Sequence, residues 1–129
     1  MSVVALVVDD SMLIRHTVCR FLEERGFEVE SATNGQEALE ALKTIRPDVI
    51  ITDIQMPKMS GSELITAVKN NPSLASIPIV IVASKQSGFE RTENRANYTI
   101  FKDIDIEDQL TKALHAVLGA KAQAAKSSI

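Results

Sequence analysis

The stretch VVALVVDDS (residues 3–11) constrains how the rest of the chain can fold. Residues 3–8 form an unbroken apolar run with no alternating polar side chains, which is typical of a strand buried on both faces. Such strands occur mostly in parallel sheets whose two faces are covered by helices. Asp9, Asp10 and Ser11 end the run, and Ser11 is suited to cap a following helix.

Further apolar runs alternate with helical patterns along the rest of the chain. We expect strands at residues 27–32, 48–52, 78–83 and 99–101. We expect helices from residue 12 to a stop at Gly26, and at residues 36–45, 62–69 and 106–119. Alternating strands and helices predict a single α/β domain with helices on both faces of the sheet.

One segment breaks this alternation. KQSGFERTENRA (residues 85–96) is strongly polar and offers Phe89 and Ala96 as core contacts. It can bury little apolar surface against a sheet, so we expect the fourth helix, between Lys85 and Arg95, to be short or absent. The predicted domain spans residues 1–119, and residues 120–129 are predicted to form a helical extension or tail.

Composition excludes several classes of protein. Of the 129 residues 45% are hydrophobic and 24% are charged, and no apolar run approaches the ~20 residues of a membrane span, so we expect no membrane insertion. The single cysteine, Cys19, cannot form an internal disulfide, and the first residues do not resemble a secretory leader, which together favour a cytoplasmic location. A formal net charge of −3 without a basic block disfavours direct nucleic-acid binding.

Three acidic residues follow two of the predicted strands. Asp9 and Asp10 come after the first strand, and Asp53 follows the third. Asp10 taken alone could be a helix cap, and Asp53 alone a turn residue. Loops at the carboxyl ends of parallel strands converge where the strand order reverses, so the three carboxylates should meet if these strands are neighbours. Such a cluster favours a small divalent cation with oxygen ligands, and Mg²⁺ is the natural candidate.

Four features occur together and in order: VVDDS (residues 7–11), IITDIQMPKMSG (residues 50–61), PIVIVAS (residues 78–84) and a strand that ends at Lys102. This combination resembles the receiver domain of two-component response regulators, including the chemotaxis regulators, over residues 3 to about 119. The resemblance implies a flavodoxin-like, doubly wound, five-stranded parallel sheet with strand order 2-1-3-4-5.

The resemblance also implies roles for individual residues. Asp53 is the expected phosphoacceptor, which takes a phosphoryl group from a histidine of a kinase or phosphotransfer protein. The expected metal site consists of Asp10, Asp53 and the backbone carbonyl of Gln55, with Asp9 reaching Mg²⁺ mainly through water. Lys102 is expected to pair with the phosphoryl oxygens. Independently of the family, a carboxylate is a nucleophile at neutral pH without a general base, and phosphoryl transfer depends mainly on positioning and charge neutralisation.

The sequence departs from the family pattern at positions that report phosphorylation. Ala83 stands where the family has a Thr or Ser, and Ser84 provides a hydroxyl one residue later. A shift of one residue along a strand points a side chain to the opposite face, so Ser84 can substitute only if the strand bulges or ends early. Asp103 stands where the family has a proline, and Thr99 where it has an aromatic residue.

These features support two main interpretations. The first is a single-domain response regulator, not an enzyme, that is phosphorylated on Asp53 and signals by binding a downstream protein. The alternative is a degenerate pseudo-receiver that acts as a phosphorylation-independent interaction module. A Mg²⁺-dependent phosphatase is disfavoured by Gln55, where that class usually has a second acid, and a flavin carrier is disfavoured because Asp9 and Asp10 would repel its phosphate.

Overall fold

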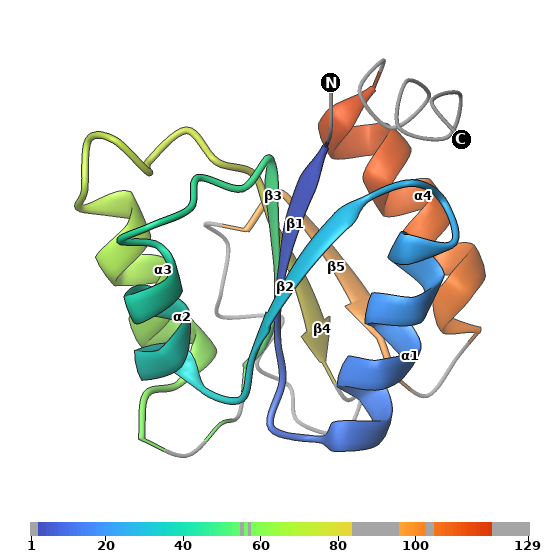
Figure 1. Cartoon of the computed structure of the whole chain (residues 1–129), viewed down its shortest axis with the longest axis horizontal. Coiled ribbons are helices and arrows are strands. Elements are labelled where there is room, and N and C mark those ends of the chain that lie inside the picture. The colour runs from blue at the N-terminus through green and yellow to red at the C-terminus, as the bar shows by residue number, and fades with distance from the viewer. Residues whose placement is uncertain (1–2, 55, 57, 84–95, 103–104, 120–129) are drawn as a thin grey trace.

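The computed structural model describes residues 3–54, 56, 58–83, 96–102 and 105–119. Within these residues five parallel strands form one sheet in the order β2-β1-β3-β4-β5 (Figure 1). The strands are β1 (Val4–Val8), β2 (Glu28–Ala32), β3 (Val49–Asp53), β4 (Ile79–Ala83) and β5 (Tyr98–Phe101). The described helices are α1 (Met12–Glu23), α2 (Gly35–Ala41), α3 (Gly61–Lys69) and α4 (Ile106–Leu118). The predicted fold class and strand order are therefore confirmed.

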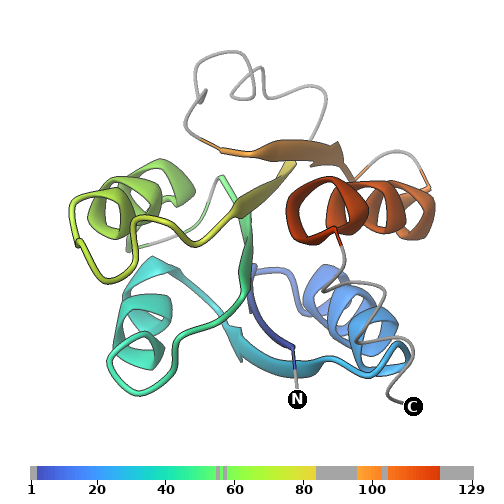
Figure 2. The ribbon, with the colours of Figure 1, turned by 90° about the horizontal axis from the view of Figure 1, so that it is seen from above.

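The sheet lies between two layers of helices. Seen from above, α1 and α4 cover one face, and α2 and α3 cover the other (Figure 2). Each layer closes an apolar core. The first includes Val7, Phe21 and Leu110, and the second includes Leu6, Ile50 and Leu64. The strand residues alternate between the two cores, which explains why β1 is apolar without interruption.

Local sequence signals determine where the helices begin. Ser11 caps α1 by accepting a hydrogen bond from the Ile14 N–H at 3.3 Å, as the sequence predicted. Ser60 and Glu63 form a capping box at the start of α3, in which each side chain accepts a hydrogen bond from the other residue's backbone N–H. These contacts satisfy backbone donors that a helix itself leaves without partners.

The second helix differs from the prediction. It ends at Ala41, whereas the sequence pattern predicted that it would continue to residue 45. The Thr44 hydroxyl donates a hydrogen bond to the Ala41 carbonyl at 3.2 Å, and the Thr44 N–H bonds the same oxygen at 3.0 Å. The Lys43 N–H likewise bonds the carbonyl of Glu40, three residues back, so beyond Ala41 the backbone tightens into turns with i→i−3 bonds instead of regular α-helix.

Two predictions fall outside the described residues. They concern the short or absent helix between Lys85 and Arg95, and the helical extension over residues 120–129. In the parts of the chain that the structure describes, no helix is both long and apolar enough to cross a membrane.

Candidate functional site

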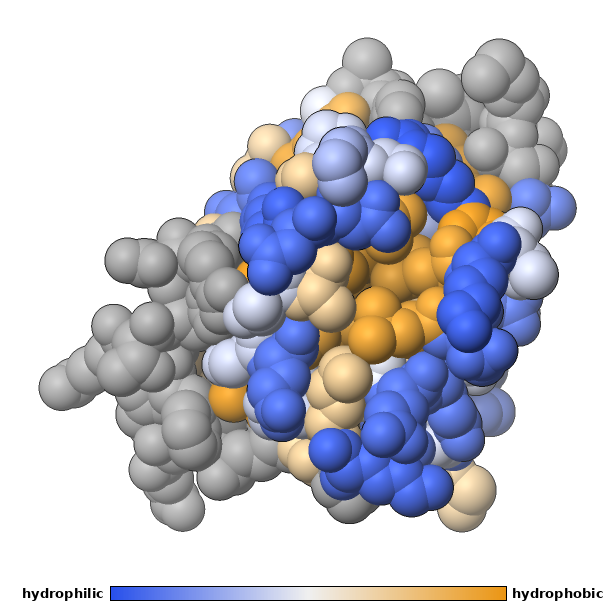
Figure 3. Space-filling model, turned by 90° about the vertical axis from the view of Figure 1, so that its left-hand side faces the viewer, coloured by the Kyte–Doolittle hydropathy of each residue, from blue (hydrophilic) through white to orange (hydrophobic). Residues whose placement is uncertain are grey.

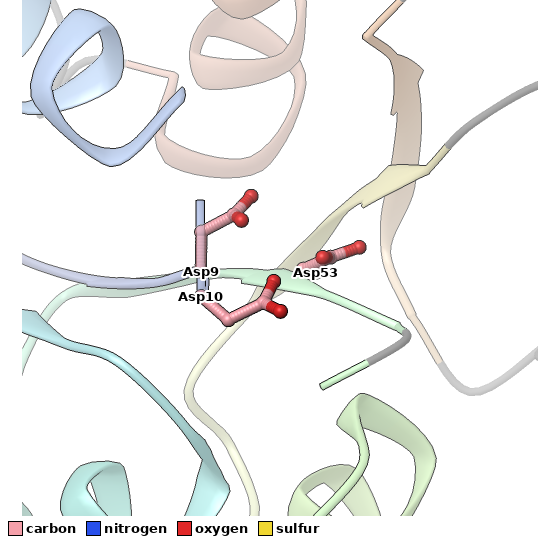
Figure 4. Close-up of side chains that lie close together, drawn as sticks. All are labelled: Asp9, Asp10 and Asp53. Carbon is pink, nitrogen blue, oxygen red and sulfur yellow. The ribbon is translucent and has the colours of Figure 1, made fainter. Parts of the chain in front are cut away.

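Three carboxylates meet at the carboxyl ends of β1 and β3. Asp9 and Asp10 follow β1, and Asp53 is the last residue of β3, which pairs directly with β1. One carboxylate oxygen from each of the three residues lies within 4.8 Å of the others (Figure 4). The sequence-based expectation that the three acids converge is confirmed, because the strands that carry them are neighbours in the sheet.

Asp9 is a buried acid whose two oxygens have different surroundings. Its side chain is almost fully buried, and its Oδ1 accepts a hydrogen bond from the Ser11 N–H at 2.9 Å. Its Oδ2 accepts no hydrogen bond within the described structure. The Nζ of Lys102 lies 3.3 Å from this oxygen and forms an ion pair without the geometry of a hydrogen bond. Asp9 Oδ2 is therefore a buried acceptor whose hydrogen-bonding capacity is not satisfied within the described structure.

Asp53 presents one oxygen to the backbone and one to a lysine. Its Oδ1 accepts a hydrogen bond from the Ile54 N–H at 2.8 Å. Its Oδ2 accepts a hydrogen bond from Lys102 Nζ at 3.0 Å. The backbone of Gly61 approaches closely behind this strand end, where its N–H donates to the Ile54 carbonyl at 2.7 Å. A Cβ at Gly61 would collide with the Asp53 carbonyl oxygen, so this turn requires glycine.

Lys102, which directly follows β5, bridges two of the three acids. Its backbone N–H donates to the Ala83 carbonyl at 2.9 Å, which fixes the lysine beyond the end of β5. The side chain of Gln109, on α4, bonds both backbone polar groups of Phe101, the preceding residue, at 3.0 and 2.8 Å. Gln109 is thus a positioning residue that sequence reasoning missed. Contacts from a side chain to distant backbone leave no periodic pattern in a sequence.

The pKa values of the site reflect burial in competition with charge pairing. Burial is the main reason that the pKa of Asp9 rises from 3.8 to about 6, and the negative charge of Asp53 adds to the effect. Burial also raises the pKa of Asp53, although Lys102 opposes it. Burial by itself lowers the pKa of Lys102, but the hydrogen bond to Asp53 and the charges of both acids outweigh it and raise this pKa. The site thus holds negative charge that a single lysine does not neutralise.

This donor set fits a hard divalent cation. Oxygen ligands from several carboxylates are what Mg²⁺ prefers, and an added positive charge would relieve the repulsion between the acids. Asp9 Oδ2, which accepts no hydrogen bond, and the exposed Asp10 side chain are both available to such an ion. Gln55, whose carbonyl was predicted to contribute, lies outside the described residues, as do Ser84 and Asp103.

The positions that depart from the family pattern are partly described. Ala83 is the last residue of β4, is 1% exposed and carries no hydroxyl. Thr99 lies in β5, opposite Ile81 of β4, and is half-buried. The Ala83 carbonyl accepts the hydrogen bond from the Lys102 N–H, and Thr99 lies three residues before Lys102 in the chain. These two altered positions therefore lie on the strands next to the lysine, while the three carboxylates themselves are all present.

The fold and the cluster define a receiver domain. Residues 5–115 match the family described as the response regulator receiver domain. The chain belongs to this family of two-component signalling domains, which are generally not enzymes. Among curated proteins, PilG of Pseudomonas aeruginosa is 33% identical over 90 residues, which cover 70% of this chain and 67% of PilG. Among solved structures, the chemotaxis response regulator CheY4 of Vibrio cholerae aligns with a TM-score of 0.83 and 35% identity, covering 92% of this chain and 100% of CheY4.

Several relatives are much longer than the matched region. A protein-glutamate methylesterase/protein-glutamine glutaminase of Clostridium acetobutylicum is 44% identical, over 67% of this chain but 26% of the relative. The gliding motility regulatory protein of Myxococcus xanthus is 39% identical, and the match covers 11% of it. The similarity to these proteins therefore concerns a receiver segment and not their other activities.

Proposed function

We propose that this protein accepts a phosphoryl group on Asp53 in a Mg²⁺-dependent reaction and signals through contacts with other proteins. The observation that carries the proposal is the position of Lys102, whose Nζ lies 3.0 Å from Asp53 and 3.3 Å from Asp9 in a cluster of three carboxylates. A lysine and a metal ion on either side of one carboxylate supply the positive charge that phosphoryl transfer requires.

In the proposed reaction a carboxylate oxygen of Asp53 attacks the phosphorus atom of a phosphohistidine. A P–O bond to Asp53 forms while the P–N bond to the donor imidazole breaks, and the imidazole leaves with the bonding electron pair. Asp53 needs no general base, because a carboxylate is already ionised in its nucleophilic form. The Lys102 ammonium already contacts Asp53. It can therefore pair with the free carboxylate before the transfer and with the phosphoryl oxygens after it.

The metal site in this proposal consists of Asp10, Asp53 and the backbone carbonyl of Gln55, with Asp9 acting mainly through water. A bound Mg²⁺ would neutralise charge on the transferred group and orient it. The residues described here meet the requirement for oxygen donors, since the three acids already lie within 4.8 Å of one another.

The proposed partners are a histidine kinase or phosphotransfer protein as donor and a downstream protein as target, in the cytoplasm. Receiver domains as a family interact with partners of these kinds. The acyl phosphate that forms is a mixed anhydride that water can hydrolyse, so it suits a transient signal.

Incubation with acetyl phosphate and Mg²⁺, followed by intact mass, tests this proposal. We expect wild-type protein to gain the mass of one phosphoryl group, and Asp53→Asn to gain none. Asp108→Asn is a matched control, because Asp108 is an exposed acid on α4 that pairs only with Lys112 in the described structure. Phosphorylation that persists in Asp53→Asn would contradict the assignment of the acceptor.

The second candidate function is a phosphorylation-independent interaction module. Ala83 favours it, because a hydroxyl at this strand end is what usually couples phosphorylation to movement in the family. Beryllofluoride, a phosphoryl mimic, distinguishes the two functions when added to wild type and to Ala83→Thr. If wild type binds the mimic and its amide resonances shift well beyond the site, the module loses support. If neither protein responds although both bind the mimic, the module gains support.

A further inference from the structure

The outer edge of β2 is an open side of the sheet. Among the described residues β2 pairs with β1 on one side and with no strand on the other. The Glu28 N–H bonds the Val3 carbonyl, and the Ala32 carbonyl bonds the Asp9 N–H. Because these bonds alternate along a parallel pair, the backbone N–H and C=O groups of Val29 and Ser31 point away from β1. Four backbone groups are thus available to a further strand.

A groove of about 710 Å³ runs along this edge. Apolar side chains line it from both faces of the sheet, including Phe27 and Val29 on one side and Val4 and Ile45 on the other. α2 ends at Ala41, two turns after it begins, and so leaves the starting ends of β1 and β2 uncovered on its face. Figure 3, which faces the side of the molecule covered by α2 and α3, shows an apolar hollow bordered by hydrophilic side chains.

The rim of the groove is acidic. Glu23, Glu28 and Glu30 all line it and are exposed, and none of them forms an ion pair within the described structure. Arg46 is the one cation of the lining, and it donates hydrogen bonds to the Ser73 carbonyl and the Ser76 hydroxyl at 3.2 Å each. These acceptors are neutral, so Arg46 keeps its charge, but three glutamates outweigh it and the lining is negative on balance.

We infer that the β2 edge is a docking site for an extended, basic segment of a partner protein, which adds as a strand beside Val29 and Ser31. Strand addition uses the exposed backbone groups for affinity and alternate side chains for specificity. Lysine or arginine opposite Glu28 and Glu30 would pair with them, and apolar residues between would pack on Val29 and Phe27. A second copy of this chain does not fit, because its own glutamates would meet these two across the edge.

This inference concerns a surface distinct from the carboxylate cluster. The groove lies at the starting ends of the strands, as the pairing of Val4 with Glu28 shows, whereas Asp9 and Asp53 lie at or beyond their carboxyl ends. Val4 and Asp9 are five residue steps apart along the strand, or about 17 Å, and the near end of the docking edge, Ser31, lies opposite Val7, two residues before Asp9. Docking here does not depend on whether Asp53 is phosphorylated, and its test uses no phosphoryl donor.

A short synthetic peptide in which Lys and Val alternate provides the test, with a Glu and Val peptide as control. We expect the basic peptide to shift the backbone amide resonances of Val29 and Ser31, more weakly as salt rises. Charge reversal in Glu28→Lys with Glu30→Lys should weaken binding about tenfold, because two attractive cross-strand pairs become repulsive. Glu107→Lys with Asp108→Lys, an equal change of charge on exposed residues of α4, should not weaken it as much.

A second pair of variants distinguishes strand addition from general charge attraction. Ser31→Pro removes one outward N–H at an edge position that tolerates proline, while Ser31→Ala keeps it. We expect Ser31→Pro to lose binding relative to Ser31→Ala while retaining the circular dichroism spectrum of the fold. Equal binding by these two variants, equal binding of the acidic peptide, or no shift at Val29 and Ser31 with the basic peptide would overturn the inference.

Discussion

β3 buries apolar side chains along most of its length and a charge at its end. Val49, Ile50 and Ile51 are at most 1% exposed and pack into the two cores, whereas Asp53 is 6% exposed and lies beside two further acids. Burial of the apolar residues stabilises the fold, but burial of the acids opposes it, since the pKa values of Asp9 and Asp53 are both raised. The interior of the sheet thus supports a site that is electrostatically unfavourable without a bound cation.

Truncation in the sheet interior should have the largest effect on stability. Leu6 is fully buried in the core beneath α2 and α3. We expect Leu6→Ala to lower the free energy of unfolding by about 3 to 5 kcal/mol, because it removes apolar contacts and leaves a cavity. Urea denaturation measures this, and Leu39→Ala, at a partly buried position on the same side, should lose less. If Leu6→Ala lowered the free energy of unfolding by less than Leu39→Ala does, the claim that burial in the sheet interior stabilises the fold most would be wrong.

Neutralising a buried acid at the strand ends should raise the free energy of unfolding, whereas truncation in the core lowers it. The pKa of Asp9 is 3.8 in the unfolded chain and about 6 in the folded protein. The folded state binds the Asp9 proton more tightly than the unfolded chain does. The stability that this tighter binding contributes is fully present below pH 3.8 and is lost as the pH rises through 6. We expect Asp9→Asn, without Mg²⁺, to be more stable than wild type at pH 7 by up to about 3 kcal/mol.

The measurement for Asp9→Asn is the free energy of unfolding as a function of pH in both proteins. The difference between them should shrink as the pH falls towards 4, because wild-type Asp9 then becomes neutral as well. Asp108→Asn, at an exposed acid, provides the control and should change stability little at any pH. A variant less stable than wild type at pH 7 would show that burial of this charge is not unfavourable.

Mg²⁺ should partly offset the unfavourable charge at the site. At a concentration ten times its dissociation constant, we expect the ion to raise the free energy of unfolding of wild type by about 1.4 kcal/mol. Asp10→Asn with Asp53→Asn should lose this response. Thermal unfolding with Mg²⁺ and with an equal ionic strength of NaCl measures it. An equal gain in the double variant would place the ion elsewhere.

Loss of the cap of α3 should have the smallest effect. The Ser60 side chain accepts a hydrogen bond from the Glu63 N–H at 3.2 Å, and this bond is exposed to solvent. We expect Ser60→Ala to lower the free energy of unfolding by about 1 kcal/mol, and Ser62→Ala, two residues later within the first turn of the helix, to change it less. Chemical denaturation of the two variants gives the comparison, and equal losses would show that the cap itself contributes little.

The sequence by itself determined the fold class, the strand order implied by the family resemblance, and the acids that form the cluster. These features depend on local or repeated signals: the unbroken run before Asp9, the helical spacing of apolar residues, and the acids that end two strands. The prediction for α2 was four residues too long, because the backbone after Ala41 changes to turns with i→i−3 bonds. Such a change of hydrogen-bond pattern does not alter the apolar period from which the helix was predicted.

Only the tertiary structure decided how the cluster is held and which edge is open. The contact of Lys102 with Asp53 joins residues 49 positions apart. The hydrogen bonds from the Gln109 side chain to the Phe101 backbone join α4 to β5. The groove along β2 exists because α2 is short and because Glu28 and Glu30 lie on an edge strand. The lysine contact, the Gln109 hydrogen bonds and the groove all depend on distances between separate segments of the chain. Those distances are set by the packing of the whole sheet and its helices.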